Sequence, residues 1–94
     1  MSQAFTGTLA REIEQRLRAA LGPTRLVVTN DNARHRGHAG DDGSGESHFT
    51  VEVESEAFEG MSRVERQRAV NSALADLLRD RIHALAIKAR APGE

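Results

Sequence analysis

The sequence lacks cysteine, tryptophan and tyrosine, and it has only three phenylalanines and two prolines among 94 residues. Without cysteine there can be no disulfide, cysteine-based zinc site or thiol nucleophile, so a metal held by this chain alone needs His, Asp or Glu. With so few aromatics, little surface is available for stacking nucleic-acid bases. The N-terminus has no apolar run long enough for a signal peptide or a membrane span. We therefore expect a cytoplasmic protein without membrane contact.

The length allows one domain, residues 1–94, with a thin core. The formal net charge is only −1, but the charges are unevenly placed along the chain. Residues 41–59 contain seven acids and no Lys or Arg, whereas residues 61–90 contain seven basic residues and three acids. We expect one acidic surface and one basic surface.

Hydrophobic periodicity predicts two helices. The first, over about residues 6–21, has an apolar residue at every fourth position and is ended by Gly22 and Pro23. The second begins at a capping box over 62–65, in which a serine is followed three residues later by a glutamate, and extends to about Asp80.

Three short segments have the pattern of strands. Residues 25–29 are a β-branched run, and apolar and polar residues alternate from 48 to 54 and again over 84–89. Alternation predicts strands with one face buried and one face in solvent. Between the first two strands, residues at about 31–47 are rich in glycine and histidine, which predicts a flexible loop.

The predicted order is α-β-β-α-β, an α/β (α+β) arrangement. The first two strands can pair antiparallel, whereas the helix before the third strand makes a right-handed crossover that leaves the last two parallel. We therefore predict a three-stranded mixed sheet with both helices packed on one face. The exposed strand edges of such a sheet favour weak pairing with a second copy.

The topology brings all four histidines to one edge of the sheet. His35 and His38 lie in the loop, while His48 opens the second strand and His83 precedes the third. Imidazole ligates borderline metals and titrates near neutral pH, so this convergence indicates a metal or proton site. The residues alone leave His35 and His38 as ligands or solvated loop side chains, and His83 as a ligand or an edge histidine with its hydrogen bonds satisfied. His48 is expected on the solvated face, in a structural or hydrogen-bonding role.

Basic residues mark a second candidate site. Arg63, Arg66 and Arg68 lie on the first turns of the second helix, and Lys88 lies on the last strand. Such a patch is one feature of a surface that docks nucleic acid or a protein partner, but a charge run of this kind is usually a solvated helix face.

The sequence contains no convincing catalytic constellation. Ser44 and Ser47 near His48 lack the strand-to-helix elbow of a serine nucleophile, and Asp41 and Asp42 lack the burial that tunes an acid–base pair. A chain this short also has little bulk with which to form a pocket. We expect a binding protein and not an enzyme.

Several segments together resemble the BolA family, over about residues 13–92. They are Arg34-His35, the 45–49 segment Gly-Glu-Ser-His-Phe, Ser55 with 58–60, the arginine-rich start of the second helix, and the 82–87 segment Ile-His-Ala-Leu-Ala-Ile. The resemblance implies a fold similar to a class II KH domain, which has the same α-β-β-α-β order.

The resemblance also implies a function, as a partner of monothiol glutaredoxins in iron–sulfur and iron homeostasis. In such pairs a [2Fe-2S] cluster is shared: a glutaredoxin cysteine and a glutathione thiol bind one side, and the BolA-like protein binds the other. The ligands implied in this chain are His83 and His35, with His38 as the alternative loop ligand and His48 in a supporting position. The chain alone would bind no cofactor.

One segment departs from the family pattern. Members commonly have Arg-His-Arg at the start of the second helix, whereas this chain has Arg66-Gln67-Arg68, so no histidine is available there. Some members are described as transcriptional regulators. DNA binding through the second helix and the last strand is therefore the alternative function, and it would have to be sensitive to salt.

Overall fold

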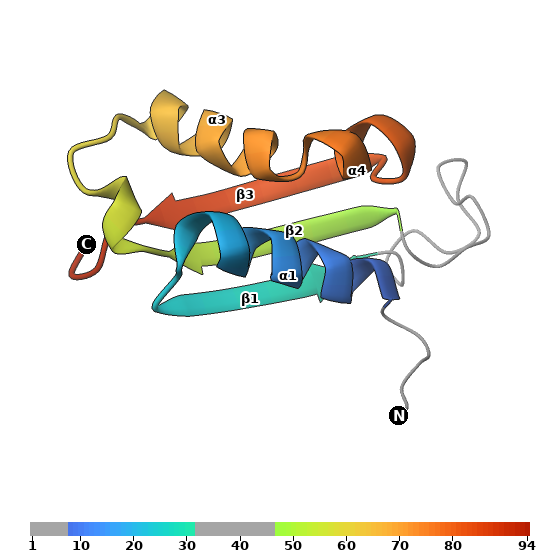
Figure 1. Cartoon of the computed structure of the whole chain (residues 1–94), viewed down its shortest axis with the longest axis horizontal. Helices are drawn as coiled ribbons and strands as arrows, with labels where there is room; N and C mark the ends of the chain where they lie inside the picture. Colours follow the sequence, from blue (N-terminus) through green and yellow to red (C-terminus); the bar gives the residue numbers. More distant parts are fainter. Residues whose placement is uncertain (1–7, 32–46) are drawn as a thin grey trace.

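The structure is a computed structural model, which describes residues 8–31 and 47–94. Its elements are α1 (Thr8–Leu21), β1 (Arg25–Asn30), β2 (His48–Glu54), the short 3-10 helix η1 (Glu56–Phe58), α3 (Arg63–Ala73), α4 (Ala75–Asp80) and β3 (Ala84–Arg90) (Figure 1). The predicted order of helices and strands is confirmed. The centre of the predicted loop, residues 32–46, lies outside the described residues.

The three strands form one sheet in the order β1-β2-β3. β1 pairs antiparallel with β2, and β2 pairs parallel with β3, as the connections predict. The helices lie on one face of this sheet (Figure 1). The mixed sheet with helices on one side is therefore confirmed.

The core lies between the sheet and the helices. Phe49, Val51 and Val53 alternate along β2 and are buried, while the residues between them are only partly covered. From the helical side, α1 contributes Leu9, Ile13 and Leu17, which repeat every fourth residue as the helical period requires.

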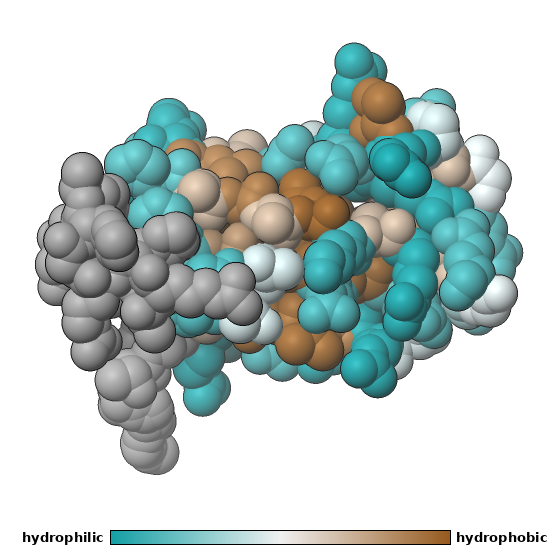
Figure 2. Space-filling model, turned by 180° about the vertical axis from the view of Figure 1, so that it is seen from behind, coloured by the Kyte–Doolittle hydropathy of each residue, from teal (hydrophilic) through white to brown (hydrophobic). Residues whose placement is uncertain are grey.

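No helix of the described residues covers the far face of the sheet. Seen from behind, this face shows hydrophilic side chains around smaller hydrophobic patches (Figure 2). Glu52 and Glu54 of β2 and Lys88 and Arg90 of β3 are paired in register, at positions that alternate with the inward-facing residues. We call this side the open face.

The second predicted helix is divided into two at Leu74. This residue has φ −112° and ψ 16°, and its N–H lies 3.2 Å from the carbonyl oxygens of both Val70 and Asn71. Leu74 and Leu77 are both buried, so the core continues across the break. Among the described residues, no helix is both long and apolar enough to cross a membrane.

A buried serine joins the ends of three elements. The Ser55 hydroxyl donates to the Leu21 carbonyl at the end of α1 (2.6 Å) and accepts from the Ala57 N–H of η1 (3.0 Å). The Ser55 N–H donates to the Arg90 carbonyl at the end of β3 (3.0 Å). Neither η1 nor this junction is predicted by the sequence pattern, whereas the predicted capping box at the start of α3 is present.

Candidate functional site

Two of the four histidines meet at the predicted edge of the sheet. The rings of His48 and His83 are stacked, with centroids 5.3 Å apart and planes inclined by 13°. Backbone bonding explains the contact, because the His83 N–H donates to the Ser47 carbonyl (2.7 Å) and the parallel pairing then sets His48 opposite Ala84. The prediction that these histidines share one edge is confirmed.

The two stacked rings differ in their surroundings. His48 is partly covered, and its Nδ1 lies 3.1 Å from the hydroxyl of the buried Ser47. His83 is exposed, and within residues 8–31 and 47–94 its imidazole has no hydrogen-bond partner. An exposed neutral imidazole can offer a nitrogen lone pair to a metal. His83 is therefore placed to act as a ligand, with His48 packed against its ring.

Both ends of the glycine-rich segment adjoin these histidines. At one end, Asp31 donates its N–H to the His48 carbonyl (2.8 Å) and accepts from the Thr50 hydroxyl (2.6 Å). At the other end is Ser47, next to His48 in the chain. His35 and His38 themselves lie outside the described residues. Within the part described, no group of three or more His, Asp or Glu side chains can hold a metal ion.

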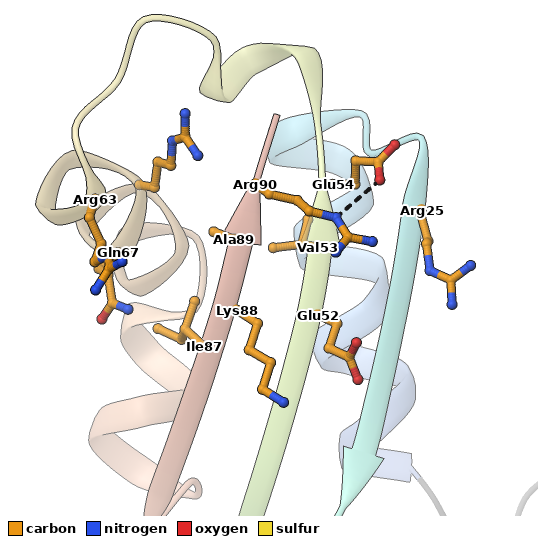
Figure 3. A pocket seen from close by; sticks show the side chains of 11 residues that line it. Arg25, Glu52, Val53, Glu54, Arg63, Gln67, Ile87, Lys88, Ala89 and Arg90 are labelled. Carbon is orange, nitrogen blue, oxygen red and sulfur yellow. Dashed lines mark hydrogen bonds and ion pairs between the residues drawn. The ribbon is translucent and has the colours of Figure 1, made fainter. Parts of the chain in front are cut away.

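The basic residues lie toward the other end of the sheet. Arg63 and Lys88 line a pocket of about 370 Å³ together with the C-terminal half of β3 (Figure 3). Arg68 is exposed on α3 and does not line this pocket. The pocket contains neither of the two described histidines, so the structure separates the basic site from the histidine site.

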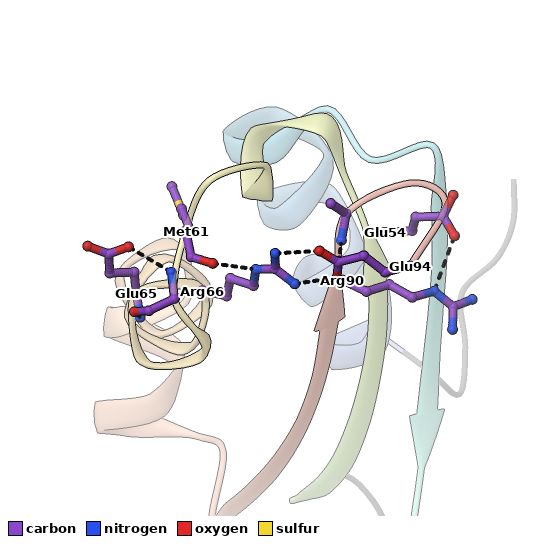
Figure 4. A network of polar contacts seen from close by, with 8 residues as sticks. Glu54, Met61, Glu65, Arg66, Arg90 and Glu94 are labelled. Carbon is purple, nitrogen blue, oxygen red and sulfur yellow. Dashed lines mark hydrogen bonds and ion pairs between the residues drawn. The ribbon is translucent and has the colours of Figure 1, made fainter.

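Arg66 differs from its neighbours because an acid of the same chain already holds it. Its guanidinium forms two bonds to the Glu94 carboxylate (2.6 and 2.7 Å), and its Nε donates to the Met61 carbonyl (3.1 Å) (Figure 4). The Arg66 guanidinium, aided by the Ala91 N–H, lowers the pKa of the Glu94 carboxyl from 4.5 to about 2. Of the three predicted helix arginines, Arg66 is thus the one that forms an ion pair within residues 8–31 and 47–94.

Several charged residues of this pocket are not among the predicted site residues. Arg25 of β1 and Glu52, Glu54 and Arg90 line it as well, and Arg90 forms an ion pair with Glu54 (3.2 Å). The sequence pattern that could have identified them is the alternation of apolar and polar residues, which places charged residues at 52, 54, 88 and 90 on one face of β2 and β3. Strand register was needed to bring Arg25 opposite Glu54.

Comparisons with known proteins agree with this fold. The family model described as BolA-like protein matches residues 17–94. The chain is 49% identical over 88 residues to an uncharacterized protein in the cobS 5′ region of Sinorhizobium sp, covering 93% of this chain and 95% of that one. It is 43% identical to human BolA-like protein 1, covering 94% of this chain and 61% of that protein. Among solved structures, the BolA domain of SufE1 from Arabidopsis thaliana is similar with a TM-score of 0.81 and 35% identity, covering 94% of this chain and 96% of that one.

Proposed function

This chain belongs to the BolA family, and on that premise we propose that it is a binding protein that shares a [2Fe-2S] cluster with a monothiol glutaredoxin. The observation that carries the proposal is the exposed His83 ring, stacked on His48 beside both ends of the segment that contains His35 and His38. In this proposal His83 is one ligand and His35 the other, with His38 as the alternative.

The donor chemistry supports this division of ligands. Iron–sulfur clusters are held by thiolates or by a mixture of thiolate and imidazole, and this chain has no cysteine. It can therefore supply only the imidazole side, while the partner's cysteine and a glutathione thiol supply the sulfur side. When bound, the cluster would gain a higher and pH-dependent potential from imidazole ligands, which suits a role in cluster maturation or in iron and redox regulation.

His48 has a positioning role in this proposal. Its ring is fixed by its place at the start of β2 and by the contact with Ser47, and it packs against the ring of His83. Stacking of this kind restricts the orientations that an exposed side chain adopts. His48 would therefore orient His83 without being a ligand itself.

The cluster is tested by its visible absorption and circular dichroism spectra, recorded on the chain purified anaerobically with a monothiol glutaredoxin and glutathione. We expect a spectrum that differs from that of glutaredoxin alone and that reverts in His83→Ala. His35→Ala and His38→Ala identify the loop ligand, because only one of them should give the same reversion. His48→Ala is the positioning control and should retain a mixed-ligand spectrum.

Gel filtration of the same samples separates loss of a ligand from loss of docking. A His83→Ala protein that still elutes with glutaredoxin, but carries only the glutaredoxin spectrum, has lost a ligand. A spectrum that does not change in His83→Ala, His35→Ala or His38→Ala would contradict the proposal.

DNA binding is the second candidate function, and the exposed cations of α3 and β3 favour it. Arg63, Arg68 and Lys88 form no ion pair within the described part of the chain, so they are available to phosphates. In this function, each arginine or lysine that contacts a phosphate adds about one unit to the salt dependence of binding. Arg63→Gln and Lys88→Gln should each reduce that slope, whereas His83→Ala should leave it unchanged.

A further inference from the structure

A charged pocket lies at the end of the sheet away from the histidines. It lies beside β3, which leads from the His83 end to Lys88 over about 16 Å at the usual rise of a strand. The side chains that matter for recognition come from four elements (Figure 3). They are Arg25 of β1, Glu52 of β2, Arg63 of α3, and Ile87, Lys88 and Ala89 of β3.

The pocket has an unbalanced positive charge. Two of its cations are neutralised, because Arg90 pairs with Glu54 and Arg66 pairs with Glu94. Its other cations are Arg25, Arg63 and Lys88. These three are exposed and form no ion pair within residues 8–31 and 47–94. Glu52 is the one pocket acid without such a pair, so the surplus corresponds to two positive charges.

Glu94, which does not itself line the pocket, shows how a carboxylate binds one of the arginines of the pocket wall. The Glu94 carboxylate binds the Arg66 guanidinium through both oxygens and also accepts the Ala91 N–H (3.1 Å). Two parallel bonds from one guanidinium match the planar geometry of a carboxylate. A carboxylate is thus already seated on one arginine of the pocket wall, while three further cations have none.

We propose that this pocket binds an acidic segment of a protein partner, through two of its carboxylates. The surplus of two positive charges matches two carboxylates, and in an extended segment alternate side chains point to the same side. Ile87 and Ala89 add partly buried apolar surface between the charges. The proposal goes beyond the proposed cluster site, because it needs neither histidines nor iron.

A nucleic-acid backbone fits this pocket less well. Glu52 and Glu54 lie within it, and a chain of closely spaced phosphates would approach both carboxylates. A peptide can place its acids at the unpaired cations and leave neutral residues beside the two glutamates. The mixture of signs in the pocket therefore favours a short acidic peptide over DNA.

The test is fluorescence anisotropy of the full chain, without glutaredoxin or iron, at near-physiological salt. The probe is a short labelled peptide with two alternate glutamates in a glycine–serine background, and its control carries glutamine at the same positions. We expect binding of the glutamate peptide only. Combining Arg63→Gln with Lys88→Gln should weaken it about tenfold, because two charge contacts are lost.

Arg68→Gln is the control for the Arg63→Gln half of this double variant, because it removes one arginine charge from the same helix outside the pocket. It should change the affinity by less than about twofold. Equal weakening by Arg68→Gln and by the pocket variants would mean diffuse attraction and would overturn the proposal. So would tight binding of a labelled DNA duplex with no binding of the peptide. Failure of this test leaves the proposed cluster untouched, since the cluster experiment measures how the visible spectrum depends on His83.

Discussion

The two ends of the sheet use their polar side chains differently. At the end where β2 and β3 finish, many of these groups bond back into the chain, as Ser55 does with α1 and Arg66 with Glu94. At the end where β2 and β3 begin, the backbone is bonded in the same way, but the ring of His83 remains exposed. Internally bonded groups hold the fold together, whereas exposed donors are available to ligands. The comparison indicates that fold-supporting contacts gather at the end where β2 and β3 finish, beside the exposed cations of the pocket, whereas the His83 ring is left exposed for a ligand.

Among substitutions of these polar side chains, Ser55→Ala is expected to cause the largest loss of unfolding free energy. The substitution leaves the Leu21 carbonyl and the Ala57 N–H without their buried partner, which typically costs about 1–3 kcal/mol of unfolding free energy. Urea denaturation measures the loss. Ser72→Ala, on the exposed side of α3, is the control and should stay within about 0.5 kcal/mol. Similar values for the two variants would remove the structural role that we assign to this end.

A smaller effect is expected from acid. Arg66 and the Ala91 N–H lower the pKa of the Glu94 carboxyl from 4.5 to about 2, so the contact stabilises the fold above pH 4.5 and is lost as the pH falls toward 2. Glu94→Gln removes this titration. The melting temperature of the parent chain should therefore fall more steeply than that of Glu94→Gln between about pH 4.5 and 2.

Glu59→Gln is the control for this pH dependence, since Glu59 is exposed and forms no ion pair within the described residues. It should retain the steep response of the parent chain. Parallel curves for the parent and Glu94→Gln would show that the contact with Arg66 contributes nothing in solution.

The smallest effect on stability is expected at the histidine end. His83→Ala removes an exposed ring and should change the unfolding free energy by less than about 0.5 kcal/mol, measured by urea denaturation. The neighbouring Ile82 is buried, and Ile82→Ala should cost about 2–5 kcal/mol. A large loss in His83→Ala would mean that the ring supports the fold, and the contrast drawn between His83 and the other end would then be wrong.

Local pattern predicted much of the fold. The alternation over 48–54 and 84–89 identified two strands and their buried faces, and the crossover rule then placed His48 and His83 at one edge. The break at Leu74 was not predicted, because the apolar spacing on either side of it suits one continuous helix. The assignment of His35 or His38 as a ligand remains a prediction.

The sequence by itself determined the order of the elements, the parallel and antiparallel pairings and the edge shared by His48 and His83, because periodicity, capping and crossover handedness are local or topological properties. Only the tertiary structure decided which charges are paired. Arg66 meets Glu94 across 28 residues of chain, and Ser55 meets Leu21 across 34. Which residues form such contacts depends on which ends of the helices and strands lie side by side after packing. The spacing of residues along the sequence does not give this information.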